Sequence, residues 1–138
     1  MKRYGTAILL VCVLTMLVVG VVEAHANLAR STPAAGDVLA TAPAEIVMEF
    51  TENLDPSFTK AQLINCQNQV VNPGPGQIDP AKPKVWHLTI GALPKDSYTV
   101  IWRARSATDG HITNGNIPFG IGVAPTPSEM AETLLKMM

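Results

Sequence analysis

Proline and glycine interrupt this chain so often that long helices have little room. The sequence holds 11 prolines and 10 glycines in 138 residues, and the densest cluster is Pro73-Gly74-Pro75-Gly76. Proline cannot continue a helix and glycine weakens one, so the stretches between them favour short strands. The segments with strand character are 46–50, 58–64, 70–71, 85–90, 98–105 and 117–123. This layout predicts an all-β domain.

The clearest strand is 98–105, in which apolar residues recur at every second position. Its shared face carries Tyr98, Val100, Trp102 and Ala104. Side chains two residues apart in a strand point to the same side of the sheet, so this face is expected in the core. Leu93-Pro94 ahead of Tyr98 is typical of the corner that pins a strand in immunoglobulin-like sandwiches. Several such strands predict an antiparallel sandwich or a Greek-key barrel.

The segment 85–90 shows the same alternation. Trp86, Leu88 and Ile90 share one face, and His87 points the opposite way. We therefore expect His87 to be exposed to solvent and not to bind metal.

The first 24 residues have the layout of a signal peptide. Lys2-Arg3 precede an apolar run over 7–22, and Ala24 supplies a small residue at a cleavage position. A membrane-spanning helix is the alternative, but the run of about 16 residues is shorter than the roughly 20 that a bilayer requires. We predict a signal peptide at 1–24 and an exported protein with no membrane span after cleavage.

The mature chain, 25–138, is long enough for one domain, predicted at 25–124, followed by a C-terminal tail at 125–138. Removing the signal peptide takes two of the 10 basic and one of the 11 acidic residues, which leaves 8 and 10 and a net charge of −2. This charge argues against a nucleic-acid partner. Cys66 would be the single remaining cysteine, so no intramolecular disulfide can form. The alternatives are a soft metal ligand and an intermolecular bridge, but we expect Cys66 to be buried or semi-buried in a monomeric protein.

Two further segments are predicted to lie outside the sheets. Residues 72–83 are expected to form an exposed loop. Residues 128–138 can form a helix with Ser128 as a cap and Met130, Leu134, Met137 and Met138 on a weak apolar face. We nevertheless expect a mobile tail. Methionines favour copper(I), but Met48 stands alone in a strand and the other three crowd the terminus, which argues against such a site.

The residues most suited to metal chemistry lie at the two ends of the domain. His25 would be the first residue after cleavage at Ala24, so its α-amine and imidazole would form a chelate of the kind that copper(II) accepts in a square plane. Asp109-Gly110-His111 adds a carboxylate and an imidazole across a glycine turn. Taken alone, this turn could be an ordinary solvated loop. Cleavage after Ala26 would also satisfy the small-residue rule, and it would remove His25.

These residues resemble the CopC-type periplasmic copper-binding domain family. The resemblance begins at His25-Ala26, Leu28, Ser31, Pro33, Gly36, Ala42-Pro43 and Phe50-Thr51-Glu52, and it continues through Tyr98-Thr99-Val100, Trp102, Ser106, Asp109-Gly110-His111, Gly115 and Phe119. It implies a Greek-key β-sandwich or barrel of cupredoxin-like or immunoglobulin-like topology. It also implies cleavage after Ala24, because the mature chains of that family begin with the copper-binding histidine.

The resemblance further implies a copper(II) site made by the His25 amine and imidazole, Asp109 and His111, with Glu52 near the metal. The sequence departs from the family pattern by one extra residue between Ser106 and Asp109 and by Ile112, where proline is frequent. Both changes leave the ligand types intact but bear on the geometry of the turn. A methionine-rich copper(I) loop is absent from the sequence.

The function implied is that of a periplasmic or secreted copper(II) carrier or buffer in copper homeostasis and resistance. Its partners would be the copper ion and a membrane copper transporter, such as an inner-membrane permease. We expect no catalysis. The alternatives are a copper-dependent oxidase with a histidine brace, and an immunoglobulin-like interaction module without a metal.

Overall fold

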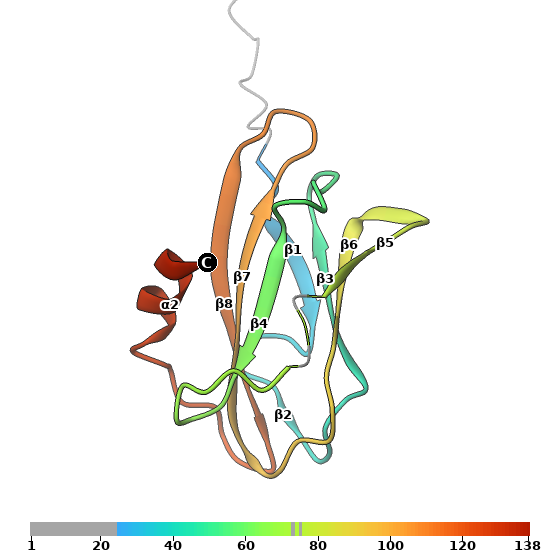
Figure 1. Ribbon diagram of the computed structural model, residues 1–138. Helices are drawn as coiled ribbons and strands as arrows, with labels where there is room; N and C mark the ends of the chain where they lie inside the picture. The colour runs from blue at the N-terminus through green and yellow to red at the C-terminus, as the bar shows by residue number, and fades with distance from the viewer. Residues whose placement is uncertain (1–24, 73, 75) are drawn as a thin grey trace, which may run out of the picture.

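The protein is a sandwich of two four-stranded sheets, described here from a computed structural model (Figure 1). The structure describes residues 25–72, 74 and 76–138; the predicted signal peptide lies outside them. Sheet A has the order β1-β3-β6-β5, made by Leu28–Thr32, Glu45–Phe50, Lys82–Thr89 and Gln77–Asp79. Sheet B has the order β2-β8-β7-β4, made by Val38–Leu39, Ile112–Ile121, Asp96–Arg105 and Lys60–Ile64. Neighbouring strands are antiparallel except β2 and β8, which run parallel, and the predicted all-β sandwich is confirmed.

The core lies between the inner faces of the two sheets. Alternate residues of β3 point inward, so Ile46, Met48 and Phe50 are buried. The predicted apolar face of 98–105 meets them from β7, and the rings of Phe50 and Trp102 pack edge to face with centroids 5.2 Å apart. Burial of one such large side chain stabilises the fold by about 1.5–3 kcal/mol.

The corner before β7 is present as the sequence predicts. The Tyr98 hydroxyl donates a hydrogen bond to the Pro94 carbonyl oxygen over 2.8 Å, and its ring stacks on Phe119 in β8. This contact ties the loop to the start of the strand. It thereby positions the long β7–β8 hairpin, whose far end carries Asp109 and His111.

Several strand boundaries differ from the sequence prediction. The predicted loop at 72–83 is wrong in part, because β5 forms within it and β6 begins at Lys82. Strand β8 begins at Ile112, well before 117, because its first residues pair with β7 across the hairpin. Residues 70–71 make only an isolated bridge from Val70 to Ile64. These edge and hairpin segments owe their conformation to a neighbouring strand and not to their own alternation.

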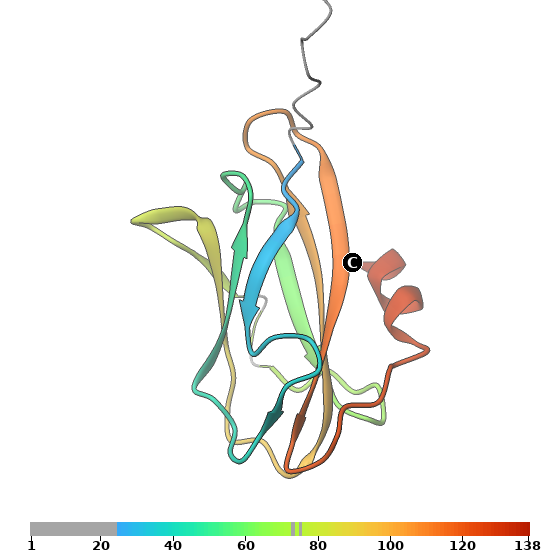
Figure 2. The same ribbon diagram turned by 180° about the vertical axis from the view of Figure 1, so that it is seen from behind.

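The mobile tail is also corrected, because its residues form helix α2 (Ala131–Met137) on the outer face of sheet B (Figures 1 and 2). Ala131 is buried against Ile64 and Ile101, side chains that face away from the main core. The face of the helix that packs on the sheet differs from the predicted apolar face, since Met137 is 78% exposed. Ser128 does not cap the helix; its hydroxyl donates to the Asn68 side-chain oxygen.

Cys66 is exposed, which corrects the prediction that it is buried or semi-buried. It follows β4 in a turn where no apolar layer covers it. A hydrogen bond with the Asp96 carboxylate raises the pKa of its thiol above the ordinary value. Within the described part of the chain, no helix is long and apolar enough to cross a membrane.

Candidate metal site

Three segments that are distant in the chain meet at one end of the sandwich. They are the start of the described chain, the loop that follows β3, and the hairpin between β7 and β8, which lies beside the first of these in both views (Figures 1 and 2). Each segment carries one or more of the site residues predicted from the sequence.

The Asp109-Gly110-His111 turn is closed by Ser106. The Gly110 amide donates to the Ser106 carbonyl oxygen over 3.0 Å, and the Ser106 amide donates to the His111 carbonyl oxygen over 2.9 Å. Gly110 has φ +75°, a conformation that glycine adopts without steric cost. The Ser106 hydroxyl oxygen accepts the amides of Thr108 and Asp109 over 3.1 and 3.4 Å. These bonds accommodate the extra residue between Ser106 and Asp109.

Asp109 and His111 form a close pair within this turn. His111 Nδ1 lies 2.6 Å from Asp109 Oδ2, and the His111 amide donates to Asp109 Oδ1 over 3.0 Å. The hydrogen bond from the His111 ring, followed by that from its amide, lowers the pKa of Asp109 to about 2. The same ring hydrogen bond, aided by the charges of Asp109 and Glu52, raises the pKa of His111. The imidazole side chain is 62% exposed and leaves Nε2 available to a ligand from solvent.

His25 lies directly beside this pair. The imidazole rings of His25 and His111 have centroids 4.8 Å apart and are tilted by 39°. Ala26, the next residue, is completely buried and anchors the chain start to the core. The fold therefore brings together the histidines that the sequence places at opposite ends of the domain.

Glu52 lies next to the turn, close enough for its charge to act on the His111 ring. Its Oε2 accepts a hydrogen bond from the Ser106 hydroxyl over 2.5 Å. Ser106 in turn accepts the Asp109 amide, so the Glu52 carboxylate acts on Asp109 through that serine. Ser106 is part of the family resemblance, but the sequence alone assigns it no role at the site, because its hydrogen bonds to Glu52 and to the turn depend on the fold.

Both Asp109 oxygens are engaged by His111. No set of three His, Cys, Asp or Glu side chains within residues 25–72, 74 and 76–138 is already arranged to hold a metal ion. To bind one ion together, Asp109 must release the Nδ1 hydrogen bond and the rings must rotate. The backbone of the candidate site is therefore in place, but its side chains are not oriented to bind one ion together.

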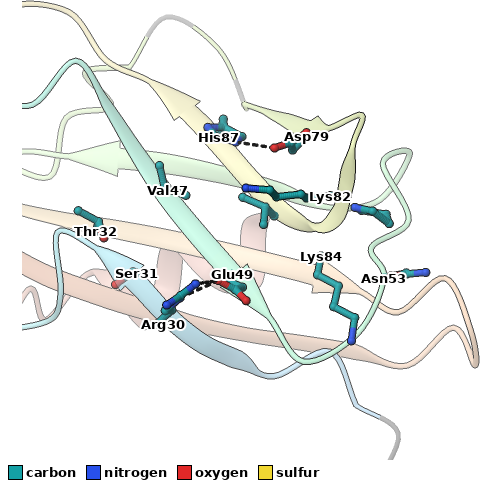
Figure 3. A pocket seen from close by; sticks show the side chains of 12 residues that line it. Arg30, Ser31, Thr32, Val47, Glu49, Asn53, Asp79, Lys82, Lys84 and His87 are labelled. Atoms are coloured by element: carbon teal, nitrogen blue, oxygen red, sulfur yellow. Dashed lines mark hydrogen bonds and ion pairs between the residues drawn. The ribbon is translucent and has the colours of Figure 1, made fainter.

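His87 differs from the sequence expectation of an exposed side chain. It is 26% exposed, with Nδ1 3.0 Å from Glu45 Oε2 and Nε2 3.6 Å from Asp79 Oδ2. The side chain lines a hollow of about 710 Å³ on the outer face of sheet A, where Figure 3 shows it facing Asp79. Strand β5, which the sequence did not reveal, supplies the Asp79 that faces the ring.

Two of the curated proteins with similar sequences carry copper-related names. Copper resistance protein C of Pseudomonas syringae pv. tomato is 35% identical over 112 residues, which cover 77% of this chain and 87% of that protein. Protein YobA of Escherichia coli K12 is 32% identical over 120 residues, covering 86% of this chain and 93% of YobA. Copper transport protein CutJ of Bacillus subtilis is 34% identical over 102 residues, which cover 73% of this chain but only 19% of CutJ.

Solved structures agree with the sequence relatives. CopC from Methylosinus trichosporium OB3b has a TM-score of 0.66 at 25% identity, covering 75% of this chain and 98% of that one. The methionine-rich copper resistance protein PcoC of Escherichia coli has a TM-score of 0.58 at 30% identity, covering 71% and 99%. Residues 28–122, which include Asp109 and His111 and begin just after His25, match the CopC domain. The chain therefore belongs to the CopC domain family.

Proposed function

We propose that the mature protein binds one copper(II) ion through the His25 α-amine and imidazole, Asp109 and His111, and serves as a copper carrier or buffer in copper homeostasis and resistance. The observation that carries this proposal is the meeting of His25 and His111, with ring centroids 4.8 Å apart, beside the Asp109 carboxylate. The copper-related names of its relatives support the same metal.

The donor set favours copper(II) over other abundant divalent ions. Three nitrogens and one oxygen can occupy the corners of a square plane, which copper(II) prefers, whereas zinc has no electronic preference for that geometry. The His25 amine and imidazole belong to one residue and form a chelate. The raised pKa of His111 means that copper must displace a tightly held proton from this ring.

The buried position of Ala26 supports cleavage after Ala24. A mature chain that began at Asn27 would lose the fully buried Ala26 side chain together with His25. Cleavage after Ala24 keeps both residues and leaves the amine on His25. Such processing corresponds to an exported protein in the periplasm or outside the cell.

Transfer of copper, without catalysis, is the activity that the site supports best. His111 and the loop that carries it lie at the exposed end of the sandwich, where a partner can reach the ion without entering a cleft. The partner we propose is a membrane copper transporter. An oxidase would need open equatorial positions for oxygen, and here Asp109 takes one of them. Oxygen consumption with a reductant should therefore stay at the level of a His111→Ala control.

The test compares the processed protein with a form that carries one methionine before His25. Every side chain is retained, but the α-amine becomes an amide, which is a poor ligand. Copper(II) affinity, measured against a competing chelator, should fall by orders of magnitude, and the electron paramagnetic resonance spectrum should change. Circular dichroism checks that the sandwich is unaltered. Equal affinities and identical spectra for the two forms would exclude a site at the terminus.

A further inference from the structure

We infer that Thr51 and Thr113 are positioning residues that hold residues 25–27 in place and thereby set the affinity and coordination mode of the copper site. This inference rests on the proposed function, in which His25 is a ligand. The hydrogen bonds made by these two threonines to residues 25–27 are called the threonine clamp below.

Thr51 holds the chain on both sides of Ala26. Its hydroxyl donates to the His25 carbonyl oxygen over 2.6 Å and accepts the Asn27 amide over 3.0 Å. Its own amide donates to the Asn27 carbonyl oxygen over 2.9 Å. Leu28 pairs with Phe50 at this end of the β1–β3 ladder. The backbone and side-chain hydrogen bonds of Thr51 therefore continue the pairing towards His25.

Thr113 holds the same segment from the opposite sheet. It lies in β8, two residues after His111, and its hydroxyl donates to the Ala26 carbonyl oxygen. Thr51 follows β3 of sheet A, so the clamp joins the two sheets across the chain start. The His25 and Ala26 carbonyls are therefore both held by hydroxyl groups, while the His25 ring stays beside His111.

This arrangement matters because a chain terminus normally frays and would carry the chelate with it. Ordering one backbone residue costs about 1–2 kcal/mol, which corresponds to roughly 5- to 30-fold in affinity if copper binding must supply the order. The threonine clamp orders residues 25–27 before copper binds, so copper binding does not have to offset this cost. It also engages the His25 carbonyl oxygen, which could otherwise form a competing chelate with the amine. Copper is thus directed to the amine and imidazole pair.

The variants that test the clamp are Thr51→Val and Thr113→Val, which keep the side-chain shape and remove the hydroxyl. Each should weaken copper(II) binding by the processed protein by roughly 5- to 30-fold. Thr51→Ser retains the hydroxyl and should restore binding to within about threefold, a small residual for the lost methyl group. Thr89→Val, at an exposed position in β6, is the matched control and should bind like the parent.

Two readouts separate positioning from general stability. In the metal-free protein, the Asn27 amide should exchange with solvent faster in both valine variants, and ¹⁵N relaxation should show greater motion at 25–27. In a His25→Ala background that also carries an added N-terminal methionine, Thr51→Val should cause no further loss of copper affinity, because both the imidazole and the free α-amine that the clamp positions are gone. An equal loss in both backgrounds would mean that the threonine acts only on stability, and the inference would be wrong.

The same measurements distinguish failure of the clamp from failure of the proposed function. If His25→Ala binds copper(II) as tightly as the parent, the proposed site itself is wrong. If His25 is required but both valine variants bind like Thr89→Val, only the clamp is refuted. If Thr51→Val fails to fold, the copper affinities of Thr113→Val and Thr51→Ser still test the inference. A Thr113→Val variant that binds copper(II) like Thr89→Val contradicts it.

Discussion

Two histidines of this protein each lie beside a carboxylate, but their surroundings prepare them for different roles. His111 is 62% exposed at the end of the sandwich, with Asp109 at Nδ1 and the ring of His25 nearby. His87 is 26% exposed on the face of sheet A, where Glu45 faces one ring nitrogen and Asp79 the other. The first ring keeps a nitrogen for an incoming ion. The second has both nitrogens facing carboxylates of its own sheet.

The metal site that we propose requires more than a histidine and a carboxylate in contact. What distinguishes the His111 end is a third donor from elsewhere in the chain, on a backbone held in place by neighbouring hydroxyls. At His87, the carboxylates come from adjacent strands of one sheet and connect β3, β5 and β6. We assign a structural role to His87 for this reason.

The largest expected difference between the two histidines is in copper affinity. His111→Ala should lower the copper(II) affinity of the processed protein by orders of magnitude, because one imidazole donor is lost. His87→Ala should leave it within about twofold, a difference of only about 0.4 kcal/mol. Competition titration against a chelator measures both values. Equal losses for the two variants would remove the distinction drawn above.

Acidification should reveal the same contrast. Copper must displace protons from an amine and imidazoles, whose ordinary pKa values are about 8 and 6.5, and the pKa of His111 is raised further. Copper affinity should therefore fall by about a hundredfold between pH 7 and pH 6, with proton release on binding. Calorimetry in buffers of different ionisation enthalpy counts the protons released. A pH-independent affinity in this range would contradict amine and imidazole ligation.

Stability should show the opposite order of effects. His87→Ala removes a hydrogen bond to Glu45 and a charge contact with Asp79 from a half-buried ring, and it should lower the free energy of unfolding by about 1 kcal/mol. His111→Ala alters an exposed loop and should change the free energy of unfolding less than His87→Ala does. Urea unfolding of the metal-free proteins provides the comparison. A larger loss of stability in His111→Ala than in His87→Ala would contradict the structural role assigned to His87.

The smallest expected effect is the pH dependence that arises from the Asp109 and His111 pair. The lowered pKa of Asp109 stabilises the fold above its ordinary value of 3.8, and this contribution is lost as pH falls towards about 2. The raised pKa of His111 stabilises it below 6.5, and this contribution is lost as pH rises through the folded-state pKa. The pair thus acts mainly between pH 3.8 and 6.5.

An NMR titration of the metal-free protein tests this pair directly. The His111 ring should titrate above 6.5, and Asp109→Asn should bring its pKa back towards that value, because the charged partner is removed. Asn114→Asp, which adds a charge in β8 outside the turn, controls for a general change in surface charge. A His111 pKa unaffected by Asp109→Asn would mean that the close contact does not persist in solution.

The elements that the sequence predicts best are those whose residues carry their own signal. The alternation in 98–105 places Tyr98 and Trp102 in the core, and the Pro94 corner forms as expected. The sequence did not predict strand β5, and it predicted a mobile tail where helix α2 forms, because both elements are stabilised by contacts with other parts of the fold. β5 is held by its pairing with β6, and α2 by the isoleucines of sheet B that Ala131 covers.

His87 and Cys66 show the same limit for single side chains. Alternation correctly places His87 away from the core, but it cannot reveal that Asp79 comes across from a neighbouring strand. For Cys66, a general preference for burial was outweighed by its place in an exposed turn. In both cases, the outcome depends on which residues the fold places nearby.

The chemistry of the proposed site is already present in the order of the residues. A histidine at the predicted mature terminus and an Asp-Gly-His turn specify the donor types, because amine, imidazole and carboxylate have fixed ligand preferences. Their meeting depends on long-range pairing: β1 with β3 brings His25 to the end of the sandwich, and β7 with β8 presents His111 there. The hydroxyls of Thr51 and Thr113 also donate hydrogen bonds to the carbonyl oxygens of His25 and Ala26, an arrangement that depends on strand register and cannot be read from local residue patterns.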